Sequence, residues 1–146
     1  MSRKIFAKGQ KLALDTVALI YFLERHPVHY ATAKKIFRQL EAGHCTGVMS
    51  SLVFAELLVP AYRAKDARQA GQLVQLLTNF PNLEIISLTP QLSVEAAKIR
   101  ANHGLRTPDA IHAATALAAG VDCFITNDKR FSALGDQLVV SLFDGV

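Results

Sequence analysis

The sequence predicts an α/β fold in which a central, mainly parallel sheet of about five strands lies between two layers of helices. Short apolar runs, bounded by turn or capping residues, alternate with longer segments of helical periodicity. Such alternation produces βαβ units, whose helices cover both faces of a parallel sheet. The composition, with 51% hydrophobic and 19% charged residues, is that of a globular protein that buries a substantial core.

Five apolar runs are the candidate strands, and helical periodicity fills the segments between them. The predicted strands are residues 11–14, 47–51, 83–88, 123–126 and 138–143. The predicted helices are residues 16–25, 28–42, 52–64, 66–79, 90–103 and 107–119, and a short turn follows at 129–134.

Proline and glycine residues mark several helix ends. Thr89 and Thr107 each precede a proline, so their hydroxyls are expected to cap helices whose first turn tolerates the missing N–H. Gly104 and Gly120 follow the predicted ends of two helices, as C-terminal caps do. Pro60 is expected to kink or shorten its helix.

Length and composition predict that residues 1–146 form a single domain, which we expect to be cytoplasmic. No repeat, linker or apolar run of the roughly 20 residues needed to cross a bilayer is present, so we expect no membrane contact. The basic residues 1–11 lack the apolar stretch of a signal peptide. Cys45 and Cys123 have no CxxC spacing and are expected to be free, buried thiols. The net charge of +4 is compatible with a polyanionic partner but is a weak indication alone.

Four of the 12 acidic residues occupy positions that a stable fold does not require. Asp15 and Asp128 end apolar strands, Asp109 opens an alanine-rich helix, and Glu56 lies in a helix among apolar neighbours. Taken singly, each aspartate could cap a helix or interact with the positive end of the helix dipole. Glu56 could instead form a salt bridge with an arginine, because an unpaired buried carboxylate is expensive.

The predicted topology brings these four carboxylates to one edge. Parallel strands place Asp15 and Asp128 at the same edge, and the helix that begins near Asp109 runs antiparallel to the strand before Asp128. Glu56 lies about one turn into the helix after the second strand. Clustered carboxylates raise each other's pKa values unless a cation neutralises them. Oxygen ligands of this kind suit Mg²⁺ or Mn²⁺, which support phosphodiester hydrolysis.

Three stretches of the chain resemble the PIN domain, particularly the single-domain type found in VapC-like toxins of prokaryotic toxin–antitoxin pairs. They are "LALDTVALIYFLE", "SSLVFAELL" and "LRTPDAIHAATALAAGVDCFITNDKRF". The resemblance covers nearly the whole chain and is most specific in the last stretch. It implies a three-layer α/β/α fold and a metal-dependent ribonuclease that leaves 5′-phosphate and 3′-hydroxyl ends. It also implies an RNA substrate, a homodimer, and an antitoxin that holds the toxin inactive.

The resemblance further implies roles for individual residues. Asp15, Glu56, Asp109 and Asp128 would be the catalytic acids that hold Mg²⁺ or Mn²⁺. The resemblance together with the chemistry of such sites adds three polar neighbours and two basic residues. Thr16 and Thr126 would orient waters or carboxylates, Asn127 would contact metal or phosphate or else shape the turn, and Lys129 and Arg130 would contact the RNA backbone.

Some features favour or weaken particular alternatives. Val17 stands where the family commonly has a polar residue, which removes one polar group beside Asp15, and it also argues against a haloacid-dehalogenase-type phosphatase. His112 is more typical of a structural histidine than of a catalytic base. A PIN fold that binds RNA or a partner without cutting, and a general RNA-processing nuclease, remain alternatives. The stretches "VALIYFL" and "LVFAELLVPAY" could form an antitoxin groove or be plain core.

Overall fold

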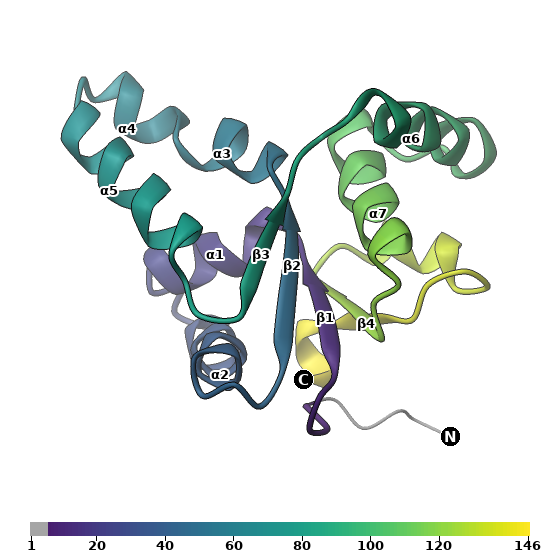
Figure 1. Ribbon diagram of the computed structural model, residues 1–146, viewed down its shortest axis with the longest axis horizontal. Helices are drawn as coiled ribbons and strands as arrows, with labels where there is room; N and C mark the ends of the chain where they lie inside the picture. The colour runs from purple at the N-terminus through teal and green to yellow at the C-terminus, as the bar shows by residue number, and fades with distance from the viewer. Residues whose placement is uncertain (1–5) are drawn as a thin grey trace.

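A five-stranded sheet, in which every neighbouring pair of strands is parallel, crosses the centre of the protein (Figure 1). The computed structural model describes residues 6–146, so part of the basic N-terminal segment lies outside the described residues. The strands are β1 (Lys11–Leu14), β2 (Thr46–Ser50), β3 (Leu83–Ile86), β4 (Cys123–Thr126) and β5 (Val140–Leu142). The predicted number of strands is confirmed, and the sheet is entirely parallel.

The order of the strands, β3-β2-β1-β4-β5, places β1 at the centre. The chain adds β2 and β3 on one side of β1 and then adds β4 and β5 on the other. Leu14 pairs with Ile125, so β1 and β4 end side by side. In open parallel sheets, ligands bind beyond the carboxyl ends of the strands where the strand order reverses. Here that place lies between Asp15, after β1, and Asn127, after β4.

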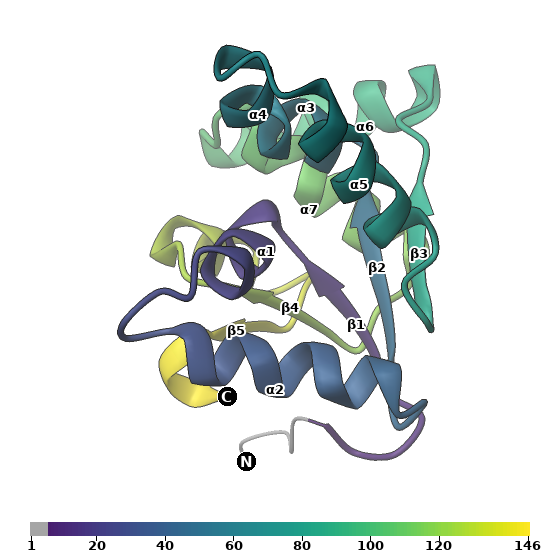
Figure 2. The same cartoon turned by 90° about the vertical axis from the view of Figure 1, so that its left-hand side faces the viewer.

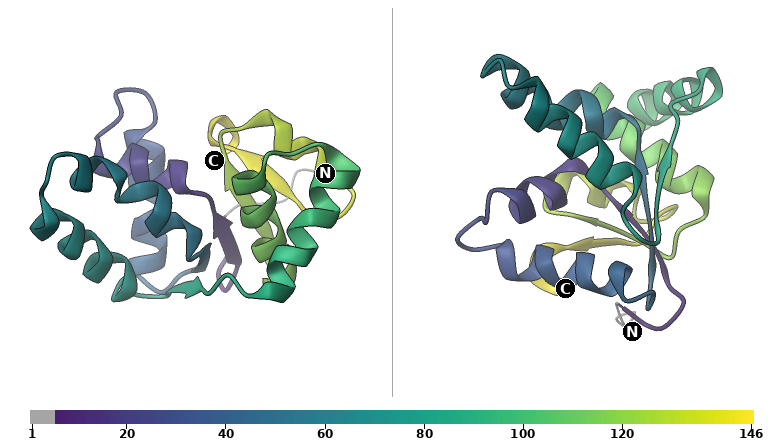
Figure 3. Two further views of the ribbon diagram at one scale, coloured as in Figure 1. Left: turned by 90° about the horizontal axis from the view of Figure 1, so that it is seen from above. Right: turned by 60° about the vertical axis from the view of Figure 1, so that its left-hand side comes forward.

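Helices cover both faces of this sheet. They are α1 (Thr16–Leu23), α2 (Tyr30–Glu41), α3 (Leu52–Leu57), α4 (Val59–Arg63), α5 (Ala67–Thr78), α6 (Pro90–His103) and α7 (Thr107–Ala119), with 3₁₀-helices η1 (Lys129–Leu134) and η2 (Phe143–Gly145). Leu12 and Leu14 of β1 pack with α1, α2 and α5, whereas Ala13 between them packs with α6, α7 and η1. This alternation is the period of a strand buried on both faces, and Figure 3 shows the two helical layers from two sides.

The helix ends largely follow the predicted signals. The hydroxyl of Thr89 accepts a hydrogen bond from the Leu92 amide, and both Gly104 and Gly120 end helices in the left-handed conformation, with φ of 70° and 63°. The prediction for Thr107 is wrong because Thr107 is itself the first residue of α7, after an extended Arg106. A proline is tolerated anywhere in the first turn, where its N–H would have no partner, so the helix begins one residue earlier.

The predicted helix at 52–64 is two helices. α3 ends at Leu57 and α4 begins at Val59, because Pro60 has no N–H to donate to the carbonyl of Glu56. Glu56 is therefore next to the last residue of a short helix and not in a helix interior, and 34% of its side chain is exposed. Glu56 lines an open cavity together with Asp15, Asp109 and Asp128.

Two other expectations concern the chain as a whole. Cys45 and Cys123 are buried, and neither forms a disulfide, as predicted. Within residues 6–146, no helix has the length and apolar character required to cross a bilayer.

Candidate active site beyond strands β1 and β4

A cavity of about 590 Å³ opens beyond the carboxyl ends of β1 and β4, and all four of the singled-out acids line it. Asp15 follows β1, Glu56 lies in α3, Asp109 lies in the first turn of α7, and Asp128 follows β4. Parallel strands and an antiparallel helix have thus brought together residues that are more than a hundred positions apart in the chain.

Asp15 is the most buried of the four, with 8% of its surface exposed. One carboxylate oxygen accepts a hydrogen bond of 2.6 Å from the Thr126 hydroxyl, and the other accepts one of 3.2 Å from the Val17 amide. Burial raises the pKa of Asp15 to about 6, although these hydrogen bonds oppose the increase. Asp15 therefore caps α1 and is also a desolvated carboxylate that a nearby cation would stabilise.

Glu56 is held by two donors from other elements. The Thr16 hydroxyl lies 2.7 Å from Glu56 Oε1, and the His112 Nε2 lies 2.6 Å from the same oxygen. Burial acts to raise the pKa of Glu56, but the hydrogen bonds from His112 and Thr16 outweigh it, so the pKa falls below its usual range. The alternative, a salt bridge between Glu56 and an arginine, does not form within the described residues; the partners of Glu56 are Thr16 and His112.

His112 was expected to be structural, and it is buried, yet it belongs to the site. Only 4% of its side chain is exposed, and its ring lines the cavity with Asp109, one helical turn earlier. Its Nδ1 has no hydrogen-bond partner and is the one buried side-chain nitrogen or oxygen in this state among residues 6–146. The spacing of three residues from Asp109 was the available signal, because residues at i and i+3 share a helix face.

Two arginines neutralise the other two acids. Arg130 donates from Nε to both oxygens of Asp128 at 3.0 Å, and this contact holds the pKa of Asp128 below its usual range. An Arg130 Nη also lies 3.6 Å from Asp109, which accepts a hydrogen bond of 3.2 Å from Arg106 Nε. Arg106 was not predicted, although its place three residues before Asp109 was a signal. Arg130, expected to contact RNA, lies against the acids in this structure.

The remaining predicted residues surround the acids. Thr126 is fully buried, and its hydroxyl accepts a hydrogen bond of 3.1 Å from the Asp128 amide while donating to Asp15. Asn127 donates from Nδ2 to the Tyr21 hydroxyl at 3.0 Å. Lys129 is exposed and lines the cavity.

The chemistry of the donors fits a divalent cation. Four carboxylates line one cavity; one of them is desolvated, and two form ion pairs with arginines. In the part of the chain that the structure describes, no three His, Cys, Asp or Glu side chains are placed to hold a metal ion together. Arg130 occupies the space between Asp109 and Asp128 that a cation shared by these two would need.

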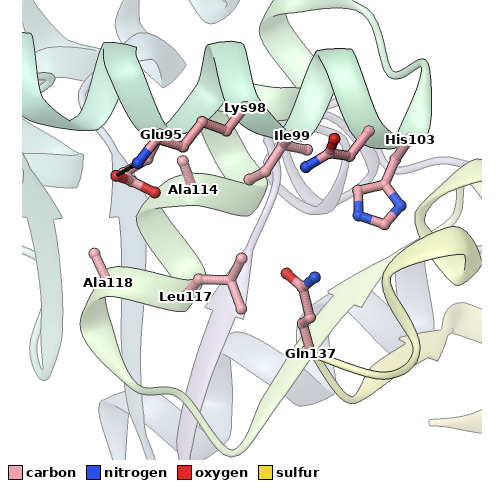
Figure 4. A pocket seen from close by; sticks show the side chains of 9 residues that line it. Glu95, Lys98, Ile99, His103, Ala114, Leu117, Ala118 and Gln137 are labelled. Carbon is pink, nitrogen blue, oxygen red and sulfur yellow. Dashed lines mark hydrogen bonds and ion pairs between the residues drawn. The ribbon is translucent and has the colours of Figure 1, made fainter.

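A second cavity, of about 420 Å³, lies between α6, α7 and Gln137 (Figure 4). Its charged residues, Glu95 and Lys98, pair with each other, and it contains none of the residues singled out from the sequence. The acids therefore define the candidate site.

Several solved proteins share this fold. The model of the PIN domain family matches residues 12–137. A toxin–antitoxin complex from Klebsiella pneumoniae has a TM-score of 0.67 at 21% identity, over 92% of this chain and 99% of that chain. VapBC-1 from nontypeable Haemophilus influenzae has a TM-score of 0.67 at 24% identity, over 92% of this chain and 98% of that chain. VapC20 from Mycobacterium tuberculosis, described as a sarcin-ricin loop cleaving toxin, has a TM-score of 0.68 at 19% identity. The match covers 85% of this chain and 95% of that chain.

At these identities the solved structures establish the fold. None of the curated proteins matches the chain in sequence. Because the family model spans most of the chain, from β1 to the segment before β5, the protein belongs to the PIN domain family.

Proposed function

We propose that this PIN domain, residues 1–146, is a ribonuclease that requires Mg²⁺ or Mn²⁺ and is the toxin of a type II toxin–antitoxin pair. The observation that carries the proposal is the convergence of Asp15, Glu56, Asp109 and Asp128, from four separate elements, on one cavity beyond β1 and β4. Four carboxylates at such a place weaken the fold, so their presence is best explained by a cation and a phosphate substrate.

Each residue has a task in this proposal. Asp15, Asp109 and Asp128 would hold the cation directly or through water, and Glu56 would complete the set. The bound cation would neutralise charge on the scissile phosphate and make a water molecule more acidic. Thr126 fixes the orientation of Asp15 and of the Asp128 backbone through its hydroxyl. Thr16 fixes Glu56 in the same way.

Cleavage by purified protein tests the proposal directly. Wild-type protein is expected to cut single-stranded RNA with Mg²⁺ or Mn²⁺ and to stop when EDTA is added. Asp15→Asn and Asp109→Asn are expected to bind RNA without cutting it. Asp136→Asn is a matched control, because Asp136 is exposed and does not line the cavity.

The proposal fails if the wild-type protein cuts no RNA with either metal while Asp15→Asn leaves both Mn²⁺ binding and growth inhibition unchanged. That result would favour the alternative, a PIN domain that binds RNA or a partner without cleavage. Sequencing of RNA ends after induced expression of wild type and Asp109→Asn would separate a toxin with a narrow target from a general RNA-processing nuclease.

We also propose an antitoxin as a partner, on the grounds of the similar toxin–antitoxin complex. A homodimer is proposed on the resemblance of the sequence to VapC-like toxins. An apolar cavity of about 270 Å³ lies between α1, α4 and α5 and shares Glu56 with the acidic cavity. Ile20, Leu23 and Leu73 line it, so an apolar antitoxin segment seated there would also cover the acids.

The antitoxin would be sought in an adjacent gene for a small DNA-binding protein. Co-expressed with that protein, Leu23→Lys is expected to lose binding. Leu76→Lys is expected to keep it, because Leu76 is already 44% exposed and lies outside the cavity. Equal binding by both variants would place the antitoxin elsewhere. The mass of the free protein in light scattering tests the homodimer.

A further inference from the structure

Beside the acidic cavity, three rings from one stretch of chain pack against each other. Tyr21 of α1 has its ring centroid 4.7 Å from that of His26 and 4.7 Å from that of His29, and the two histidine rings are 4.9 Å apart and nearly parallel, at 21°. All three side chains are partly exposed. Tyr21 lies in α1, and His26 and His29 lie in the segment that joins α1 to α2. Figure 2 shows this segment at the left edge of the molecule.

The ring cluster of Tyr21, His26 and His29 is fixed from beneath. Phe143, the first residue of η2, is buried and meets Tyr21 edge-on at 5.1 Å and His29 at 5.7 Å. Nδ1 of His26 accepts hydrogen bonds of 3.1 Å from the amides of Val28 and His29, which orients the His26 ring. The rings are thus held in place before any ligand binds.

Asn127 joins this ring cluster to the acids. It precedes Asp128, and both Asn127 and Tyr21 line the acidic cavity. Its Nδ2 donates to the Tyr21 hydroxyl at 3.0 Å and approaches His29 Nε2 at 3.4 Å. Both contacts use the amide nitrogen, so its amide oxygen has no hydrogen-bond partner among residues 6–146.

We propose that Tyr21, His29 and Asn127 form a subsite for one unpaired base of the RNA that the acids cut, which rests on the proposed ribonuclease function. Partly exposed tyrosine and histidine rings are the platforms on which proteins stack unpaired bases. The free amide oxygen of Asn127 would accept a hydrogen bond from the base, which favours a base with an exocyclic amino group. The scissile phosphate would then lie at the acids, next along the strand.

Charge near the ring cluster suits the flanking backbone. Lys129 lines the same cavity, and the cationic groups of Arg25 and Lys34 lie 5.9 and 5.8 Å from the ring of Tyr30, at the start of α2. If the ring cluster served only to pack the fold, apolar side chains would be sufficient. Here the rings belong to two partly exposed histidines and a partly exposed tyrosine, and the tyrosine and Asn127 line the acidic cavity.

The test measures binding apart from cleavage. The fluorescence anisotropy of a labelled single-stranded RNA of about 12 nucleotides would be followed with Asp15→Asn protein in EDTA. On that background, Tyr21→Leu and His29→Leu are expected to weaken binding about fivefold or more, whereas Tyr21→Phe and His29→Phe keep most of it. Tyr62→Leu is the control, since Tyr62 is 58% exposed on α4 and lines neither cavity near the acids.

Salt dependence separates stacking from charge. The ring variants are expected to keep the slope of log affinity against log salt, whereas Lys129→Ala reduces that slope by about one. Asn127→Ala is expected to reduce the preference between homopolymer RNAs. Should the leucine variants fold poorly in thermal melts, crosslinking of 4-thiouridine RNA to the Asp15→Asn protein gives an independent result, with adducts expected within residues 16–30.

The outcomes distinguish this subsite from the function on which it rests. If wild type cuts RNA while Tyr21→Leu and His29→Leu fold, bind and cut as wild type does, the subsite is overturned and the ribonuclease stands. If wild type cuts nothing but RNA binding still depends on the rings, the ribonuclease is overturned and the subsite stands. Binding of RNA with no dependence on the rings and no crosslink in residues 16–30 also overturns the subsite.

Discussion

The imidazole Nε2 of His112 lies 2.6 Å from Oε1 of Glu56, and this contact ties α7 to the end of α3. It holds a partly exposed carboxylate in one orientation beside the three aspartates. Groups that orient carboxylates around a metal matter nearly as much as the carboxylates themselves.

We expect His112→Leu to weaken Mn²⁺ binding and RNA cleavage by about 10-fold to 100-fold. Leucine fills the buried space without donating to Glu56. His112→Gln is expected to recover part of this loss, because its amide nitrogen reaches nearly as far as Nε2. Calorimetric titration with Mn²⁺ provides the readout that does not depend on turnover, and an equal loss in both variants would contradict a role through this hydrogen bond.

The raised pKa of Asp15 predicts how stability depends on pH. The pKa of Asp15 is about 6 in the folded protein, above its unfolded value, so the folded state holds the proton more tightly. This contribution to stability is fully present below about pH 4 and is lost as pH rises through about 6, at a cost of about 3 kcal/mol. Asp15→Asn is neutral at every pH and avoids that loss.

We therefore expect Asp15→Asn to unfold at higher urea concentration than wild type at about pH 7.5, with a gap of up to about 3 kcal/mol that closes near pH 4. The measurement is made in EDTA. Excess Mn²⁺ should narrow the gap, because it stabilises only the protein that binds it. Asp136→Asn serves as the exposed control. If the difference in unfolding free energy between Asp15→Asn and wild type does not change with pH, ionisation of the buried Asp15 does not destabilise the fold.

The strands and the edge where the acids meet could be predicted because both follow from local patterns. Buried apolar runs mark parallel strands, and a polar residue one or two positions after such a run lies at the carboxyl edge, as Asp15 and Asp128 do. Two strands keep their predicted bounds, and the other three moved by one or two residues at one or both ends, since pairing with a neighbour, and not the apolar run, decides where a strand begins and ends.

The partners of the acids could not be predicted in the same way. The contact between Glu56 and His112 joins residues 56 positions apart, and it depends on how α3 and α7 cross. The break before Pro60 exposes Glu56, a consequence that hydrophobic periodicity alone does not reveal. Arg130 was expected to face RNA because it is basic and adjacent to an acid, yet that adjacency is also what lets it fold back onto Asp128.

Thr126 links two of the acids, which predicts a cost in stability. Thr126→Val keeps the shape but removes the hydroxyl that donates to Asp15 and accepts from the Asp128 amide. Because Asp15 is buried, the lost partner should cost about 1–3 kcal/mol in the free energy of unfolding at neutral pH. Thr126→Ser keeps the hydroxyl and is expected to lose less. Urea unfolding of the two variants checks this, and equal stability would mean that water replaces the hydroxyl.

Arg130 competes with any cation for Asp109 and Asp128. It hydrogen-bonds Asp128 through Nε and lies 3.6 Å from Asp109, and this contact keeps the pKa of Asp128 low without a metal. A cation that binds both acids must first displace this exposed guanidinium. We expect Arg130→Ala to bind Mn²⁺ more tightly than wild type in calorimetric titration, whereas Lys129→Ala, beside it, changes little. Weaker Mn²⁺ binding by Arg130→Ala would instead mean that Arg130 orients Asp128 for the metal, because the carboxylate would then depend on its guanidinium for the geometry that the cation needs.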